Sequence, residues 1–108
     1  ESNEGNAAQY GELLESMIKD WRAQLGDEDL PFYIVELASY QHSERKGPDY
    51  GWNRVQAEQR RTAAKVNRTV LVPNSDLGEW NDIHPQDKKT PGERAAKAII
   101  ENNKTKTR

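Results

Sequence analysis

Two short, nearly continuous apolar runs, residues 31–38 and 69–72, constrain the fold of this chain more than any other feature of its sequence. Neither run alternates apolar with polar residues, and such runs are typical of strands in a parallel sheet covered on both faces. A helical pattern precedes each run, and a third helical pattern follows the second run. The order is therefore α-β-α-β-α, which predicts an α/β layered fold with a parallel sheet.

The first two helical segments differ in character. Residues 7–25 carry an apolar stripe at i, i+3, i+4 and i+7 spacing and end before Gly26, a frequent helix stop. We expect this stripe to lie in the core. The second segment, residues 51–66, is very polar and is expected to lie on the surface of the sheet. The stripe of the first helix consists of Tyr10, Leu13, Leu14, Met17, Ile18, Trp21 and Leu25.

The start of the third helix is marked by a capping box. Thr90, Pro91 and Glu93 are suited to the N-cap, N1 and N3 positions, which predicts that the helix begins here. The last residues, 103–108, are expected to form a frayed tail. The side chains expected to face inward are Ala95, Ala96, Ile99 and Ile100.

Composition excludes several classes of function. The 108 residues suffice for one small domain. The net charge of −2 comes from interspersed acids and bases, so the basic surface that nucleic-acid binding needs is absent from the sequence. The lack of cysteine excludes a disulfide scaffold, Cys-ligated zinc and thiol catalysis. No apolar run approaches the ~20 residues that span a bilayer. We expect neither a nucleic acid nor a membrane as partner.

Chemistry is expected in the loops that follow the strands, because active residues of open α/β sheets gather beyond the carboxyl ends of strands. The loop at 73–86 contains EWNDIHP, residues 79–85, with one of the two histidines of the chain. Asp82 precedes His84 by two positions, and a nearby carboxylate can fix the tautomer of an imidazole and stabilise the imidazolium. This spacing favours a general base. The alternative is a solvated loop histidine.

Several motifs resemble the sialate O-acetylesterases, a family of the SGNH-hydrolase superfamily close to carbohydrate esterase family six. Residues 1–3, ESN, resemble the end of the Gln-Gly-Glu-Ser-Asn motif of that family. Residues 31–38, PFYIVELA, resemble its Pro-Phe-Tyr-x-Val-Gln-Leu-Ala strand, and residues 54–60, RVQAEQR, resemble its Arg-Glu-Ala-Gln-Arg helix. Residues 82–85, DIHP, resemble its terminal catalytic loop. The resemblance extends from residue 1 to about residue 100.

This resemblance implies that the chain is the C-terminal part of a flavodoxin-like SGNH-hydrolase domain, a three-layer sandwich whose first strands and nucleophile segment precede residue 1. It implies an esterase that hydrolyses acetyl esters on sugars, sialic acids especially, by a Ser-His(-Asp) mechanism. His84 would be the catalytic base, and its orienting partner would be Asp82, another acid or a backbone carbonyl. Asn3 would donate to the oxyanion, a contribution typically worth ~10²–10³ in rate. The candidates for contact with substrate are Glu1, Ser2, Glu79 and Trp80.

The chain departs from the family in one respect, because its sequence contains no Gly-Asp-Ser turn. A triad enzyme without its serine loses most of its rate acceleration, so we expect this chain to be inactive alone. The alternative is a non-catalytic sugar-binding or scaffold module of esterase ancestry. Missing strands would also leave sheet edges and apolar patches uncovered. We therefore expect self-association, a second polypeptide carrying the N-terminal half, or a short-lived fragment.

No cofactor and no metal are expected. A metal enzyme is the third interpretation, suggested by an acidic cluster in the loop, but no second nearby histidine or recognised ligand spacing supports it. The sequence does not determine the localisation, and the resemblance implies a parent protein that is secreted, periplasmic or lysosomal. The acidic cluster consists of Asp76, Glu79, Asp82 and His84.

Overall fold

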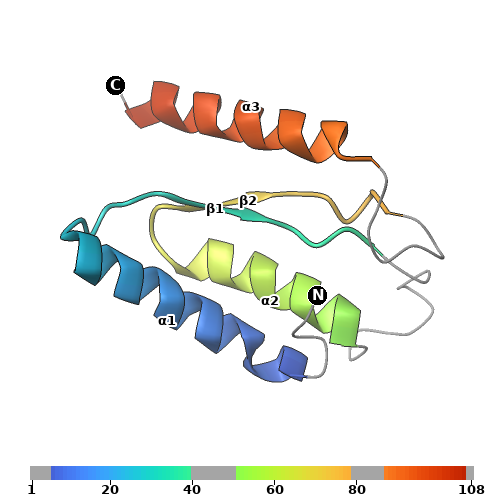
Figure 1. Cartoon of the computed structure of the whole chain (residues 1–108), viewed down its shortest axis with the longest axis horizontal. Coiled ribbons are helices and arrows are strands. Elements are labelled where there is room, and N and C mark those ends of the chain that lie inside the picture. Colours follow the sequence, from blue (N-terminus) through green and yellow to red (C-terminus); the bar gives the residue numbers. More distant parts are fainter. Residues whose placement is uncertain (1–5, 40–50, 79–86, 107–108) are drawn as a thin grey trace.

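The computed structural model describes residues 6–39, 51–78 and 87–106. A two-stranded parallel sheet carries α1 and α2 on one face and α3 on the other, so the described residues form three layers (Figure 1). The predicted order and the parallel α/β fold are confirmed. The elements are α1 (Ala7–Leu25), β1 (Phe32–Val35), α2 (Gly51–Lys65), β2 (Thr69–Val72) and α3 (Lys89–Lys106).

The two strands end at the same side of the molecule. They pair in parallel with Val35 opposite Val72. The ladder continues one residue further, because the Glu36 N–H donates to the Val72 carbonyl oxygen at 3.0 Å. The carboxyl ends of β1 and β2 therefore lie together, at the right of Figure 1. This is the side at which the sequence predicts chemistry.

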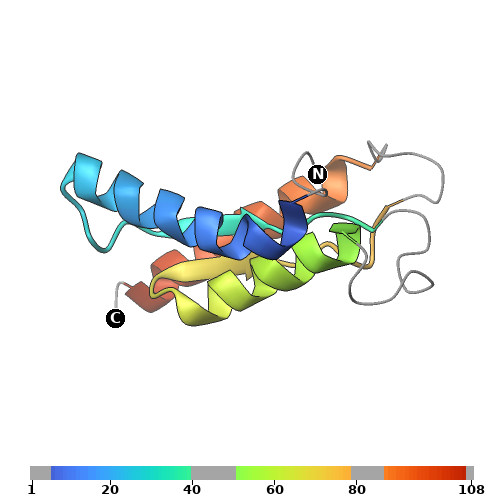
Figure 2. The same ribbon diagram turned by 90° about the horizontal axis from the view of Figure 1, so that it is seen from below.

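Helix α1 lies beside α2, as Figure 2 shows from below. Gly11 allows the close approach, since a Cβ at this position would collide with the side chain of Glu58 on α2. Arg22 ties the other end of α1 to the sheet side, where its Nε donates to the Leu30 carbonyl oxygen at 2.9 Å and its Nη2 to that of Asn67 at 2.9 Å. The buried residues of α1 are Ala7, Gly11, Ile18 and Arg22.

The expectation that the whole apolar stripe of α1 lies in the core is wrong. Of the seven stripe residues, only Ile18 is fully buried. The buried face of α1 is the face that contacts α2. This face is offset from the apolar stripe, so much of the stripe does not face α2. The exposed fractions of Leu13, Met17, Trp21 and Leu25 are 57%, 43%, 55% and 60%.

Helix α2 buries more polar side chains than its sequence suggests. Trp52 and Val55 are each 1% exposed. The polar residues buried beside them are Gln56, Glu58, Gln59 and Thr62. Polar side chains expected on the surface therefore lie between α2 and its neighbours, where each needs a hydrogen-bond partner.

The start, orientation and end of α3 differ from the expectations. The helix begins at Lys89, and Asp87 Oδ1 accepts the Thr90 N–H at 3.0 Å, so Asp87 caps it rather than Thr90. It continues to Lys106, through residues expected to form a frayed tail. One contact holds these last turns, since Asn102 Nδ2 donates to the Tyr33 hydroxyl at 2.8 Å.

The inward face of α3 is also rotated from the predicted one. Ile99 and Ile100 are 41% and 54% exposed, and Ala96 is exposed as well. The sheet side instead holds the partly buried Ala95 and Ala98. In the described parts of the chain, no helix combines the length and apolar character that a bilayer-spanning segment requires.

Candidate active site at the carboxyl ends of the strands

The residues predicted to act on the substrate lie outside the described ranges, and their positions therefore stay predictions. We call the loop at residues 73–86, which contains His84, the histidine loop. The structure does describe the start of this loop, the segment that follows β1, and the point where the loop meets α3. The predicted site residues outside the described ranges are Glu1, Ser2, Asn3, Glu79, Trp80, Asp82 and His84.

A buried carboxylate joins the ends of the two strands. Glu36 follows β1 directly and is 2% exposed. Its Oε1 accepts the main-chain N–H groups of Asn74 at 2.9 Å and Ser75 at 2.8 Å. Its Oε2 accepts a hydrogen bond from Nη1 of Arg60, on α2, at 2.6 Å. Both oxygens of this buried carboxyl group therefore have hydrogen-bond donors, as a buried polar group requires.

The two segments after the strands also bond to each other directly. The Ser39 N–H donates to the Leu77 carbonyl oxygen at 2.8 Å, and the Ser39 hydroxyl donates to the Ser75 carbonyl oxygen. Gly78 lies against the Ser39 carbonyl so closely that a Cβ would collide with it, and its φ of 111° is unfavourable for an L side chain. Position 78 therefore requires glycine.

Polar side chains of α2 hold the segment after β1. Gln56 Nε2 donates to the Leu37 carbonyl oxygen at 2.7 Å, and Gln59 Oε1 accepts the Leu37 N–H at 2.8 Å. Trp52 Nε1 donates to the Ala38 carbonyl oxygen at 2.7 Å. These bonds satisfy main-chain groups that lie beyond the ladder. We call residues 36–39 and 74–78, together with Trp52, Gln56 and Gln59, the strand-end clasp.

Helix α3 holds the histidine loop near both of its ends. Arg94 Nη1 and Nη2 bind Asp76 Oδ1 and Oδ2 at 2.7 and 2.9 Å, and Nη1 also donates to the Pro73 carbonyl oxygen at 2.8 Å. The guanidinium lowers the pKa of Asp76. At the other end, the Thr90 main-chain N–H lowers the pKa of the Asp87 carboxyl. The loop therefore leaves from one fixed point and returns to another.

One buried acceptor at the base of the loop lacks a described partner. Asn74 is 2% exposed, and its Oδ1 makes no hydrogen bond within residues 6–39, 51–78 and 87–106. An unpaired buried acceptor costs about 1–3 kcal/mol. Neither Asn74 nor Glu36 is among the site residues predicted from the sequence. For Glu36 a signal existed, since it is the only charged residue within the apolar run at 31–38.

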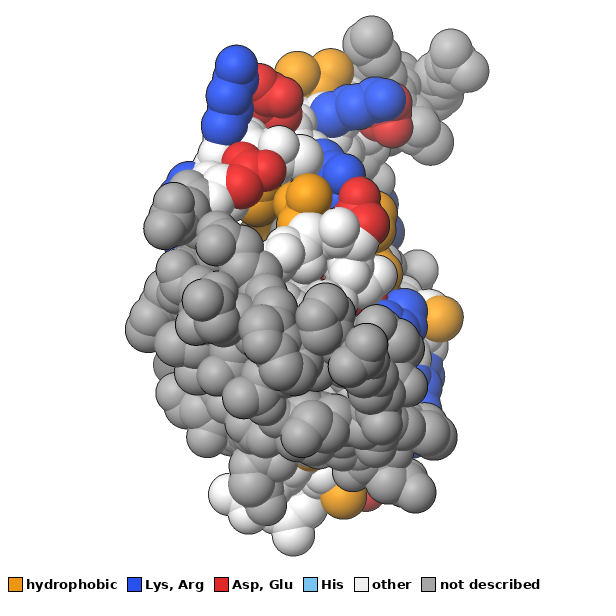
Figure 3. Space-filling view, turned by 90° about the vertical axis from the view of Figure 1, so that its right-hand side faces the viewer, with side chains coloured by type: hydrophobic (Ala, Val, Ile, Leu, Met, Phe, Trp, Pro, Cys, Tyr) orange, Lys and Arg blue, Asp and Glu red, His pale blue; other side chains and the backbone are white. Residues whose placement is uncertain are grey.

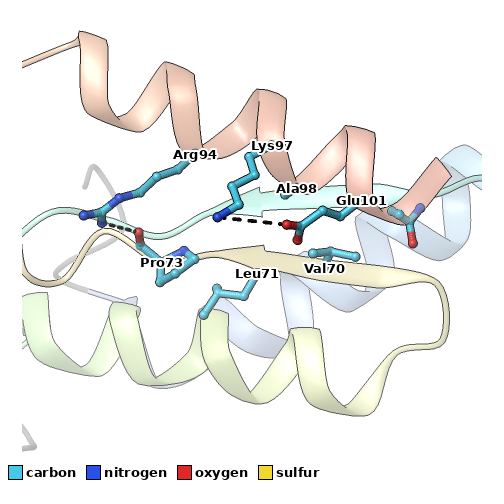
Figure 4. A pocket seen from close by; sticks show the side chains of 8 residues that line it. Val70, Leu71, Pro73, Arg94, Lys97, Ala98 and Glu101 are labelled. Atoms are coloured by element: carbon cyan, nitrogen blue, oxygen red, sulfur yellow. Dashed lines mark hydrogen bonds and ion pairs between the residues drawn. The ribbon is translucent and has the colours of Figure 1, made fainter. Parts of the chain in front are cut away.

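A groove of about 490 Å³ lies between α3 and β2 (Figure 4). Val70 and Leu71 line it from β2, and Lys97 and Glu101 form an ion pair at 4.0 Å on its α3 wall. The described residues that line it offer neither an imidazole nor a hydroxyl group, which the predicted chemistry needs. The remaining lining residues are Pro73, Arg94, Ala98 and Asn102.

The metal interpretation gains no support from the described residues. They contain no group of three side chains of His, Cys, Asp or Glu that could hold an ion. Of the predicted acidic cluster only Asp76 is described, and both its oxygens bind Arg94. Figure 3 views the molecule from the carboxyl ends of the strands, and there the described side chains of Lys and Arg are mixed with those of Asp and Glu.

Comparison with known proteins points to carbohydrate esterases. The family described as carbohydrate esterase, sialic acid-specific acetylesterase, matches residues 1–101. Among solved structures, a carbohydrate acetylesterase from Xanthomonas citri is similar, with a TM-score of 0.74 and 37% sequence identity. The match covers 83% of this chain and 20% of that one, so the chain spans about a fifth of that length. A comparison with curated protein sequences found no match.

Proposed function

The chain belongs to the carbohydrate esterase family of sialic acid-specific acetylesterases, and on this premise we propose that it forms the histidine-bearing part of an enzyme that hydrolyses acetyl esters on sugars. The observation that carries the proposal is the family match over residues 1–101, which includes the loop with His84. The strand-end clasp supports it, because it fixes the base of that loop at the edge where α/β enzymes bind substrates.

The proposed mechanism is nucleophilic catalysis by a serine with His84 as base. The serine hydroxyl oxygen attacks the acetyl carbonyl carbon while the imidazole takes the hydroxyl proton. After the tetrahedral intermediate, the imidazolium protonates the departing sugar oxygen, and the acetyl-enzyme is hydrolysed by water that His84 activates. Asp82 is the proposed orienting partner of His84, and Asn3 is the proposed donor to the oxyanion.

The proposed substrate is an O-acetylated sugar, with sialic acids as the first class to test. Glu1, Ser2, Glu79 and Trp80 are the proposed substrate contacts, since they flank Asn3 and His84 in the sequence. An indole ring offers an apolar face on which a sugar ring can pack.

We further propose that the nucleophilic serine comes from outside these 108 residues, because they contain no Gly-Asp-Ser turn. The chain would then be the C-terminal part of an SGNH esterase domain and inactive alone. Self-association, or binding of a second polypeptide with the N-terminal half, would cover the exposed stripe of α1 and the edges of the two-stranded sheet. The missing turn equally favours the second candidate function, a sugar-binding module of esterase ancestry.

Acetate release distinguishes the two functions. The chain is mixed with the serine-bearing segment of a homologous acetylesterase and incubated with O-acetylated sialic acid. We expect no release by the chain alone and release by the mixture, which His84→Ala abolishes and His42→Ala, the control at the other histidine, leaves unchanged. Sugar binding by the chain without turnover in the mixture, and unaffected by His84→Ala, would instead establish the binding module.

A further inference from the structure

We propose that Glu36 is a positioning residue for the acetyl-transfer site, whose buried carboxylate sets the direction in which the histidine loop leaves β2. The inference rests on the proposed function for its catalytic meaning. It concerns a residue that the chemistry itself does not require, since Glu36 is 2% exposed and its oxygens are occupied by main-chain and guanidinium donors.

Glu36 contacts the main chain after β2 through a single oxygen. This oxygen, Oε1, receives the N–H groups of two consecutive residues, Asn74 and Ser75, at 2.9 and 2.8 Å. Two adjacent N–H groups that converge on one acceptor fix the orientation of the peptide between them. The chain turns away from β2 at this point, so the acceptor position determines where the following residues go.

Further contacts hold the main chain after Ser75 as far as Gly78, the last described residue before the gap at 79–86. Ser39 binds the main chain of Leu77, and Gly78 lies in close contact with Ser39. His84 follows Gly78 in the same loop, and Asp87 anchors the far end of that loop on α3. We therefore expect a displacement of Asn74 and Ser75 to shift the residues that follow them along the chain. Misplacing a reacting group by about 1 Å can cost ~10² in rate.

A second buried carboxylate provides a matched comparison. Glu58 is 3% exposed, and its Oε2 binds Arg54 at 2.9 Å and Arg61 at 3.0 Å, both on its own helix. Glu58 makes no described bond to the strand-end clasp. A purely structural effect of losing a buried charge should appear at both carboxylates, whereas an effect on the histidine loop should appear at Glu36 alone.

Two variants separate the effect of the side-chain length at position 36 from the effect of its charge. Glu36→Gln keeps an oxygen at the same distance along the side chain, so the N–H groups of Asn74 and Ser75 keep their acceptor while the ion pair with Arg60 is lost. Glu36→Asp keeps the charge but withdraws the acceptor by one methylene. Positioning by Oε1 therefore predicts that Glu36→Asp disturbs the histidine loop more than Glu36→Gln does. A role through the ion pair predicts the opposite order.

The readout is the proton NMR spectrum of the two histidines, assigned with His84→Ala and His42→Ala. We expect Glu36→Asp to shift the His84 imidazole signal, Glu36→Gln to leave it near its original position, and Glu58→Asp and Glu58→Gln to leave it unchanged. An unmoved His84 signal in Glu36→Asp, or a larger shift in Glu36→Gln, would overturn the inference.

The acetate-release assay with the serine-bearing segment adds a kinetic test. Glu36→Asp should lower kcat about tenfold to a hundredfold, because His84 is displaced, and should also raise KM, because the proposed substrate contacts Glu79 and Trp80 lie in the same loop. If the wild-type mixture releases no acetate while Glu36→Asp still shifts the His84 signal, the proposed function fails and the positioning of the loop stands. If acetate is released but Glu36→Asp changes neither the signal nor kcat, the positioning fails and the function stands.

Discussion

At the scale of single residues, the site is held by a few groups that a sequence pattern does not reveal. The proposed pairing of Asp82 with His84 is inferred from residues that are close in sequence. Glu36 and Gly78 act through partners that lie far away along the chain, Asn74 and Ser39. A charged residue inside an apolar strand signals that something unusual occurs there, but only the structure shows which donors it meets.

Replacing Gly78 should be costly. Gly78→Ala forces an L side chain to a φ of 111° and into the Ser39 carbonyl, and we expect a loss of about 2–4 kcal/mol in the free energy of unfolding. Gly26→Ala is the matched control, because Gly26 has a φ of 66° with no atom near its virtual Cβ, and should cost about 1 kcal/mol. Urea denaturation measures both. Equal losses would show that Gly78 and Ser39 are not in close contact.

The ion pair of Asp76 with Arg94 should make the stability depend on pH. Arg94 holds the folded-state pKa of Asp76 below its ordinary value, so the pair stabilises the fold above that ordinary value. The stabilisation is lost as the pH falls through the folded-state pKa. Urea denaturation of wild type and Asp76→Asn should therefore differ near neutral pH and converge in acid. A difference that persists in strong acid would contradict this assignment.

At the scale of elements, the sequence predicted the type and order of the helices and strands but not their faces. The predicted ranges of α1, α2 and β2 agree closely with the observed ones. The observed buried faces of α1 and α3 differ from the predicted ones, because contacts with other elements determine which side of a helix is buried. Arg94 and Asn102 bind Pro73 and Tyr33, and these contacts orient α3 more strongly than its isoleucines do. The local capping box was likewise overridden by the Asp87 carboxylate.

The crossing of α1 and α2 can be tested with a pair of glycines. Gly11→Ala places a methyl group against the buried Glu58 side chain, whereas Gly92 on α3 has no atom near its virtual Cβ. Alanine favours a helix over glycine by about 1 kcal/mol, which should make Gly92→Ala neutral or stabilising. We expect Gly11→Ala to be less stable than Gly92→Ala by about 1–3 kcal/mol. Thermal denaturation measures both variants. Equal stabilisation of Gly11→Ala and Gly92→Ala would contradict the close contact of Gly11 with Glu58.

At the scale of the whole molecule, the sequence predicted the layered α/β fold because alternating patterns allow few arrangements. The seven-residue stripe of α1 was assigned to the core on the same logic, yet four of its members are exposed. Periodicity shows that a helix has an apolar side and does not show what covers it. The catalytic assignments rest on motifs instead, and the described residues supply the frame around them.

The exposed stripe should promote self-association. We expect the chain to sediment as species larger than a monomer, and Trp21→Ser to shift it towards the monomer, because burial of an exposed tryptophan favours association. Ile100→Ser removes a comparably exposed apolar side chain on α3 and serves as control. Analytical ultracentrifugation compares them. An equal effect of the two substitutions would show that association is not specific to the α1 stripe.

The central claim is that His84 is the base of an acetylesterase site built on the strand-end clasp. Acetate release from O-acetylated sialic acid by the chain together with a serine-bearing segment tests it most directly. We expect release that His84→Ala lowers by about 10³-fold or more and that His42→Ala leaves unchanged. Release that survives His84→Ala would show that His84 is not the base.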